Sequence, residues 1–376
     1  MKKLIMLVLS FVLIVSFVLI GNKAQASTEK LDKVKLSSSI ARTIDEDGID
    51  YFQLELKKSH SLKFAIKDAK NKKLQLMVVS GLNIDLFNRM LKEEQEGTDS
   101  TVTEKELEAY LDDFKIELAI DNLTGEESVG KSKAEIGLRK GNYIVIVMSD
   151  SNLKKYGKNY SVSITNSSNK KIERESNDSF KYAMPIKRGQ TYQASFFTIF
   201  DDVDFFKVTV PEKGQVVVKS TVKKDEKMKF SLYNTNKKKI KTIVKKSGKT
   251  YTMQAPVTKG TYYIRVSSDA FILDDAYLHY NVKTYVKTKV PTTTVTNKKG
   301  NKHDSMTITG LQKGAKVIVY KDAKKKTVLL SRTASSSKMV IKTKHLKDRG
   351  GKLFLTSKNR HLYTSSLKTI SYKAAR

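Results

Sequence analysis

Three short motifs occur twice in this chain, in the same order. Each set begins with an Asp beside two aromatic residues, continues with a glycine-led apolar run, and ends on a Tyr-x-Val stretch. Runs rich in β-branched and aromatic residues are typical of β-strands. The chain therefore contains two copies of one β-rich unit, marked by Asp50-Tyr51-Phe52, Gly141 to Val147 and Tyr160-Ser161-Val162 in the first and by Asp204-Phe205-Phe206, Gly260 to Val266 and Tyr280-Asn281-Val282 in the second.

The spacing of these motifs predicts a helical insertion in the first copy. Asp50 to Gly141 is 91 residues and Asp204 to Gly260 is 56, which leaves 35 extra residues at about positions 83–117. Apolar residues recur there at helical spacing, and Thr103 with Glu106 has the pattern of a capping box. We expect two short helices, which carry Ile84, Phe87, Met90 and Leu91 and then Leu107, Tyr110 and Leu111.

Acidic residues gather just before and inside the second copy, in a chain that is otherwise rich in lysine. In an extended segment Glu173 and Glu175 point to one side, and a second loop could close the shell. Calcium takes six to eight oxygen ligands in a flexible geometry. We therefore predict a Ca²⁺ site with five carboxylates and one amide oxygen, from Glu173, Glu175, Asn177, Asp178, Asp201 and Asp204.

The sequence resembles the bacterial pre-peptidase C-terminal (PPC) domain in the order of three motifs: E-x-E-x-N-D, then D-x-x-D-[FY]-[FY], then Gly260-Thr261-Tyr262-Tyr263-Ile264-Arg265-Val266. That family includes the collagen-binding domains of clostridial collagenases. The resemblance spans roughly residues 170–286. It implies a jelly-roll-like β-sandwich, and it implies that the same six residues bind calcium. The first copy keeps Asp47 and Asp50 but has Leu36 to Ala41 where E-x-E-x-N-D would stand, so we expect a divergent sandwich without metal there.

Residues 1–26 are typical of a secretory signal peptide. Lys2 and Lys3 precede an apolar run from Leu4 to Ile20, and Ala24-Gln25-Ala26 is a small-residue cleavage site. An uncleaved anchor is the alternative for this run. The chain has no cysteine, so no disulfide framework holds it together. We expect a secreted, extracellular protein that keeps no membrane contact once the signal is removed, with the cell wall as one place of retention.

The remaining chain is expected to form three units. Residues 27–167 would be the divergent PPC-like sandwich, residues 168–286 the calcium-binding one, and residues 287–291 a proline-marked linker. Short alternating strands follow in residues 292–376, a pattern that resembles bacterial Ig-like modules. The expected fold class is mainly β, with tandem jelly-roll-like sandwiches, a small helical insertion in the first, and a C-terminal Ig-like sandwich.

Positive charge is concentrated in the C-terminal half. Residues 27–167 hold 22 basic and 24 acidic residues, residues 168–291 hold 25 and 12, and residues 292–376 hold 21 and 3, giving net charges of −2, +13 and +18. Because 61 of the 71 basic residues are lysine, this surface favours diffuse attraction to a polyanion over recognition of a shaped ligand. Lysines that merely keep the protein soluble are the alternative.

No catalytic motif is present: the five histidines are scattered, and there is neither a cysteine nucleophile nor a phosphate-binding glycine loop. Strand tyrosines are expected in the core, although relatives use exposed ones to bind collagen. We predict a non-enzymatic adhesion or retention module for an extracellular polymer, either an anionic cell-wall polymer or a collagen-like protein, without specific nucleic-acid binding. The alternatives are an accessory or inhibitor of a secreted peptidase, and a structural wall or matrix component.

Overall fold

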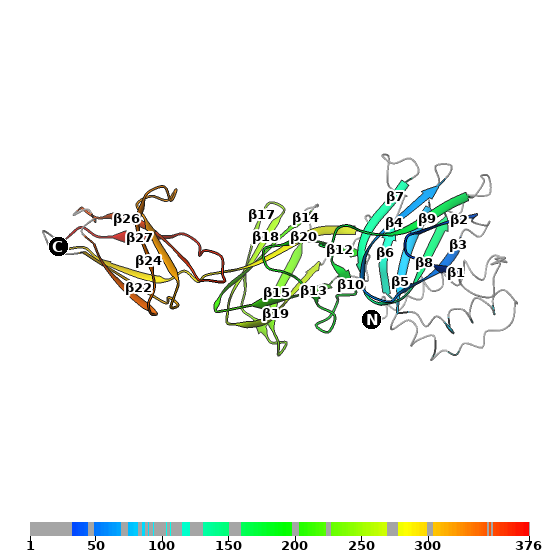
Figure 1. The fold of residues 1–376 in the computed structure, drawn as a ribbon, viewed down its shortest axis with the longest axis horizontal. Coiled ribbons are helices and arrows are strands. Elements are labelled where there is room, and N and C mark those ends of the chain that lie inside the picture. The colour runs from blue at the N-terminus through cyan, green and yellow to red at the C-terminus, as the bar shows by residue number, and fades with distance from the viewer. Residues whose placement is uncertain are drawn as a thin grey trace. The chain divides into compact units, whose positions relative to one another are not determined.

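The structure is a computed structural model, and the chain in it is almost entirely β (Figure 1). It describes residues 32–43, 49–68, 74–81, 115–120, 131–149, 159–197, 203–222, 227–268, 277–298, 304–343 and 349–375, together with residues 85, 86, 89, 93, 103, 106 and 346. The expected signal peptide lies outside the described residues. Within the described part of the chain, no helix is long and apolar enough to cross a membrane.

The chain divides into two compact units. Unit 1 comprises residues 1–182, 193–204 and 268–279, and unit 2 comprises residues 183–192, 205–267 and 280–376. The three-part division expected from the sequence stays a prediction, and Arg174–Glu175, which was expected in the second sandwich, pairs with residues 137–138 of the first.

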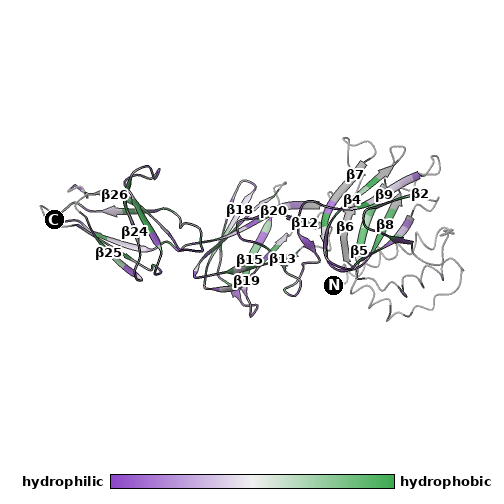
Figure 2. Cartoon of the chain, viewed as in Figure 1, coloured by the Kyte–Doolittle hydropathy of each residue, from purple (hydrophilic) through white to green (hydrophobic). Residues whose placement is uncertain are grey.

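The first pair of sheets forms a β-sandwich. One sheet has the order β1-β3-β8-β5-β6 and the other β10-β7-β4-β9-β2. Inward residues of both sheets, such as Phe52, Phe64 and Tyr143, share one buried core, and Figure 2 shows hydrophobic residues lying along these strands. The strands are β1 (Asp32–Val34), β2 (Ser38–Thr43), β3 (Ile49–Leu56), β4 (His60–Asp68), β5 (Leu74–Ser80), β6 (Lys115–Ile120), β7 (Lys131–Leu138), β8 (Gly141–Ser149), β9 (Asn159–Asn166) and β10 (Arg174–Glu175).

The insertion predicted at about residues 83–117 is helical at the described positions Asp85, Leu86, Arg89, Glu93 and Glu106, but residues 115–117 belong to a strand instead. The capping box is confirmed. Glu106 Oε2 accepts a hydrogen bond from the Thr103 amide at 2.9 Å, and the Glu106 amide donates to Thr103 Oγ1 at 3.3 Å. Arg89 also pairs with Glu106, at 2.8 Å. The apolar positions predicted for the two helices lie outside the described residues.

The second pair of sheets repeats the first. Its orders are β11-β13-β19-β15-β16 and β12-β20-β14-β18-β17, with the parallel pair β11–β13 matching β1–β3. Phe230 of one sheet packs on Tyr251 of the other, with ring centroids 5.4 Å apart. The strands are β11 (Met184–Pro185), β12 (Thr191–Phe197), β13 (Val203–Val210), β14 (Gly214–Val222), β15 (Met228–Asn234), β16 (Lys239–Ile240), β17 (Ile243–Ser247), β18 (Thr250–Val257), β19 (Gly260–Ser268) and β20 (Tyr277–Lys287).

Tyrosines of the repeated motifs are mostly core residues, as expected. Tyr143, Tyr160, Tyr262 and Tyr280 are buried. Tyr143 donates its hydroxyl to the carbonyl of Arg139, four residues before it, at 3.0 Å. Tyr262 is bonded in the same way to the carbonyl four residues before it, at 3.2 Å. The two copies therefore share a side-chain detail as well as a strand order.

The C-terminal residues form a third pair of sheets, with orders β21-β22-β25 and β24-β23-β26-β27. A separate core includes Ile308, Val319 and Leu355 from both sheets. The short alternating strands expected in residues 292–376 are present. The strands are β21 (Thr292–Thr296), β22 (Asp304–Thr309), β23 (Lys316–Tyr320), β24 (Val328–Thr333), β25 (Lys338–Thr343), β26 (Gly351–Lys358) and β27 (Lys368–Tyr372).

Candidate metal centre

The segment that carries Glu173 and Glu175 is paired on both sides. On one side Arg174–Glu175 forms the parallel strand β10 against β7, and the Gly137 amide donates to the Glu173 carbonyl at 3.1 Å. On the other side the Glu173 amide donates to the carbonyl of Gln193 on β12, at 2.8 Å. A Cβ at Gly137 would lie 2.2 Å from the Glu173 carbonyl oxygen, so this close approach requires glycine.

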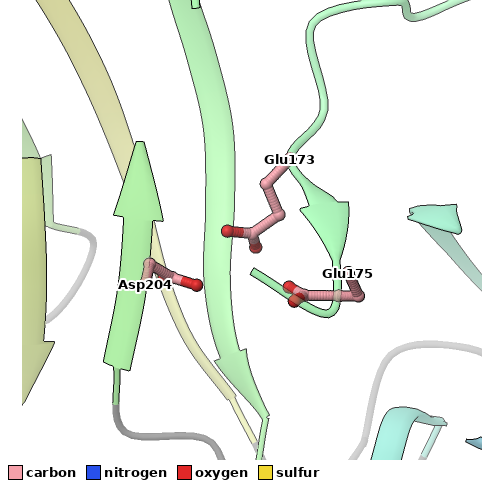
Figure 3. Close-up of side chains that lie close together, drawn as sticks. All are labelled: Glu173, Glu175 and Asp204. Carbon is pink, nitrogen blue, oxygen red and sulfur yellow. The ribbon is translucent and has the colours of Figure 1, made fainter. Parts of the chain in front are cut away.

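Three carboxylates converge at this segment (Figure 3). The side chains of Glu173 and Glu175 are 1% and 2% exposed, while Arg174 between them is only half-buried, as the alternation of an extended segment requires. Asp204, which is 0% exposed, reaches them from β13. One oxygen from each of the three lies within 4.8 Å of the others.

Hydrogen bonds orient the cluster. Glu173 Oε1 accepts from the backbone amide of Ser195 on β12 and from its hydroxyl, the latter at 3.2 Å. The backbone amide of Asn177 donates to Glu175 Oε2 at 3.3 Å, and its side-chain Nδ2 donates to Glu173 Oε2 at 3.5 Å. Asn177 is itself fully buried, and its Oδ1 accepts no hydrogen bond. A bare amide oxygen thus lies beside three carboxylates.

Such a cluster is unstable without a compensating charge. Burial removes water from the carboxylates, and each repels its neighbours, so the group must take up protons or a cation. Oxygens bound to one calcium at 2.3–2.6 Å are at most about 5 Å apart, so the observed separation suits a single ion. The all-oxygen donor set suits a hard cation better than zinc, which favours nitrogen and sulfur. These residues could hold a metal ion.

The six predicted ligands fall into three groups. Glu173, Glu175 and Asp204 form the buried triad, and Asn177 is hydrogen bonded to the two glutamates. Asp178 follows in a bend and is half-buried. Asp201 lies outside the described residues. The ligand roles of all six residues stay a prediction.

Two residues that position this segment were not anticipated. Ser195 anchors Glu173 from β12. Arg139, which follows β7, donates through Nε to the Ser176 carbonyl at 3.0 Å and through Nη2 to the Tyr182 carbonyl, and its guanidinium lies 5.3 Å from the Tyr182 ring centroid. The acidic motif itself gives no signal of either contact.

The matching aspartate of the first copy has a different environment. Asp50 Oδ2 accepts a hydrogen bond from the Tyr160 hydroxyl at 2.5 Å, and Oδ1 accepts one from the Tyr51 amide at 2.9 Å. Burial and the Asp50 charge raise the pKa of Tyr160 well above its ordinary value. Among the described residues of the first copy, no group of three or more acidic or histidine side chains could hold a metal.

Comparisons with known proteins give fold likenesses only. No protein-family model and no curated protein matches the chain. The pre-peptidase C-terminal domain of a Bacillus anthracis collagenase is 14% identical, covers 27% of this chain and 93% of its own, and has a TM-score of 0.24.

Two other solved structures are similar at the same level. The adhesin domain of Epf from Streptococcus pyogenes is 11% identical over 50% of this chain and 77% of its own, with a TM-score of 0.25. A DUF4785 family protein from Legionella pneumophila is 10% identical over 90% and 94%, also with a TM-score of 0.25. At such scores the likenesses assign no family, and the β-sandwich fold rests on the strand pairing itself.

Proposed function

We propose that this chain is an extracellular, non-enzymatic binding protein that holds a calcium ion at Glu173, Glu175 and Asp204. The observation that carries the proposal is the buried triad of Glu173, Glu175 and Asp204 beside the Asn177 amide oxygen. Three carboxylates outweigh the charge of one divalent ion, and the loop that bears Asp201 would supply further oxygens. The apolar leader at residues 4–20 supports an extracellular place of action.

Calcium would join two segments that are distant in sequence. The segment around β10 already pairs with β7 and with β12, and the ion would tie it to β13 through Asp204. Binding would therefore stabilise the native state by mass action, as RT ln(1 + [Ca²⁺]/Kd). The role of the ion in this proposal is structural, since extracellular calcium would hold the entry to the second sandwich.

The function of the chain would be retention on an extracellular polymer. The lysine-rich residues 168–376, with net charges of +13 and +18 in their two parts, favour an anionic polymer of the cell wall. Adhesion to such a polymer requires several weak contacts, which the many lysines of these residues can provide. The attraction should weaken as ionic strength rises, because salt screens exposed charges.

Two measurements test the proposal separately. Calorimetric titration of the calcium-free protein should show saturable calcium binding, and Asp204→Ala should abolish it. Residues 27–376 should sediment with purified Gram-positive cell walls at low salt, and should fail to do so after teichoic acid is stripped. Absence of calcium binding would refute the metal centre, whereas sedimentation that survives both stripping and high salt would refute retention on a polyanion.

A further inference from the structure

One sheet of the second sandwich is free of carboxylates. None of its five strands, in the order β12-β20-β14-β18-β17, contains an Asp or a Glu. The same strands carry five lysines: Lys219, Lys245, Lys246, Lys283 and Lys287. More widely, residues 227–268 contain ten lysines, one arginine and no acidic residue. The positive charge of this sheet is therefore not balanced within it.

Lysines line up in register across the outward face of this sheet. Lys219 on the central strand β14 stands directly opposite Lys283 on β20. On its other side Lys219 stands opposite Thr252 on β18, which in turn stands opposite Lys245 on β17. All three lysines are exposed, whereas the residues on either side of Lys219 in its strand are buried. Because neighbouring strands are about 4.8 Å apart, the row presents three ammonium groups along one line.

Solubility does not explain this row. Lysines that prevent aggregation belong on edge strands, but β14 is the central strand of the five and β20 is its neighbour. Like charges directly opposite each other also destabilise a sheet. In the matching sheet of the first copy, Lys63 on β4 stands opposite Glu135 on β7, although Lys67 of the same strand stands opposite Lys131.

The neighbouring residues strengthen the positive field. Burial first, and then the charges of Lys219 and Lys325, lower the pKa of Lys287. The Lys287 ammonium lies 5.4 Å from the ring centroid of Tyr285, and that ring contacts Tyr363 edge-on with centroids 5.6 Å apart. Tyr363 is 47% exposed. A polymer laid along the lysines would thus also meet an aromatic surface, which suits a polyol or sugar unit between its charges.

We propose that the outward face of this sheet, centred on Lys219, Lys283 and Lys287, binds a linear polymer with phosphate groups repeated along its backbone. The inference rests on the proposed retention on an extracellular polyanion and gives that function a location. A polymer is preferred over a single phosphate because the ammonium groups are spread along a row and lysine lacks bidentate geometry. Each contact is weak, and affinity arises from several of them on one chain.

The test compares two triple variants of residues 27–376. The binding variant is Lys219→Gln, Lys283→Gln and Lys287→Gln. Poly(glycerol phosphate) and inorganic polyphosphate are the probes, titrated at several salt concentrations. We expect the binding variant to lose at least tenfold in affinity for both probes. Its slope of log affinity against log salt should fall by about 2, since each lost phosphate contact removes about 0.7.

The control carries the same change of net charge on the first copy, as Lys57→Gln, Lys58→Gln and Lys140→Gln, all at exposed positions. Its affinity should fall less than twofold. A third variant, Lys219→Arg with Lys283→Arg, keeps the charges and should keep binding, which separates loss of charge from loss of folding.

The outcomes distinguish this site from the proposed function. Equal losses in the binding and control variants would overturn the site while leaving polymer retention intact, because net charge alone would then attract the polymer. Absence of binding by the unmodified protein would overturn both the site and the polymer part of the proposed function. The calcium titration would still decide the metal centre independently.

Discussion

Replacing Asp204 by Asn should stabilise the calcium-free protein and remove most of its stabilisation by calcium. The substitution keeps the shape of the side chain and removes one of three buried negative charges. Two unit charges 4.8 Å apart repel each other by about 3.5 kcal/mol at an effective dielectric of ~20. Proton uptake and relaxation already relieve part of this repulsion in the calcium-free protein. We therefore expect Asp204→Asn to raise its free energy of unfolding by about 1–3 kcal/mol.

Saturating calcium should make the unmodified protein more stable than Asp204→Asn. At a calcium concentration 100 times Kd, the unmodified protein gains about 2.7 kcal/mol, which corresponds to a rise of about 5–11 °C in Tm for a unit of 150–250 residues. Asp204→Asn should show little of this rise, because it lacks the charge that links β13 to the ion. The variant should thus melt above the unmodified protein in chelator and below it in saturating calcium.

Differential scanning calorimetry in EGTA and in calcium measures both effects. The control is Asp50→Asn, the equivalent position of the first copy, which should leave the calcium-dependent rise unchanged. A full rise retained by Asp204→Asn would refute the metal centre. A calcium-free variant no more stable than the unmodified protein would instead refute the claim that the carboxylates repel one another.

Three further predictions concern other parts of the chain. Lys283→Glu places opposite charges across two central strands and should stabilise the protein at low salt by about 0.2–1 kcal/mol; chemical denaturation in low and high salt will show whether the gain disappears on screening. The hydrogen bond from the Thr103 amide, together with the one from Arg89, lowers the pKa of Glu106 to about 2. Because the pKa is depressed in the folded state, the stabilisation that Glu106 contributes is present above about pH 4.5 and is lost as pH falls toward 2. An NMR titration of the Glu106 carboxyl measures this pKa. Tyr160→Phe removes the hydroxyl bonded to Asp50 and should cost about 1–3 kcal/mol with no change in calcium response; an unchanged Tm would contradict the importance of this bond.

The fold could be predicted where local pattern decides structure. The apolar, β-branched runs of Gly141–Ser149 and Gly260–Ser268 specify strands, and the Thr103 and Glu106 pair specifies a helix start, because each signal lies within a few residues. The two-residue strands β10, β11 and β16 were not predicted. They have no pattern of their own, and their pairing with β7, β13 and β15 defines them.

The candidate site likewise contains residues that local sequence pattern predicts and residues that only strand pairing reveals. Glu173 and Glu175 could be proposed from their alternation and Asp204 from its motif, since oxygen ligands are recognisable by type. Ser195 and Arg139 could not, because their roles depend on β12 and β7 lying beside the segment. The lysine row was hidden for the same reason. Lys219 and Lys283 are 64 residues apart in sequence, and only the register of β14 with β20 brings them together.

Burial explains how an acidic cluster can persist in a chain with 71 basic and 39 acidic residues. Exposed carboxylates on such a chain would attract lysines, but a lysine ammonium is strongly hydrated and is rarely buried completely. Enclosing Glu173, Glu175 and Asp204 therefore favours a small ion that can shed its water over a neighbouring side chain. The exposed lysines of β14 and β20 lie in solvent instead, where salt screens their charges. The two proposed binding events should consequently separate by ionic strength, with calcium held at salt concentrations that release the polymer.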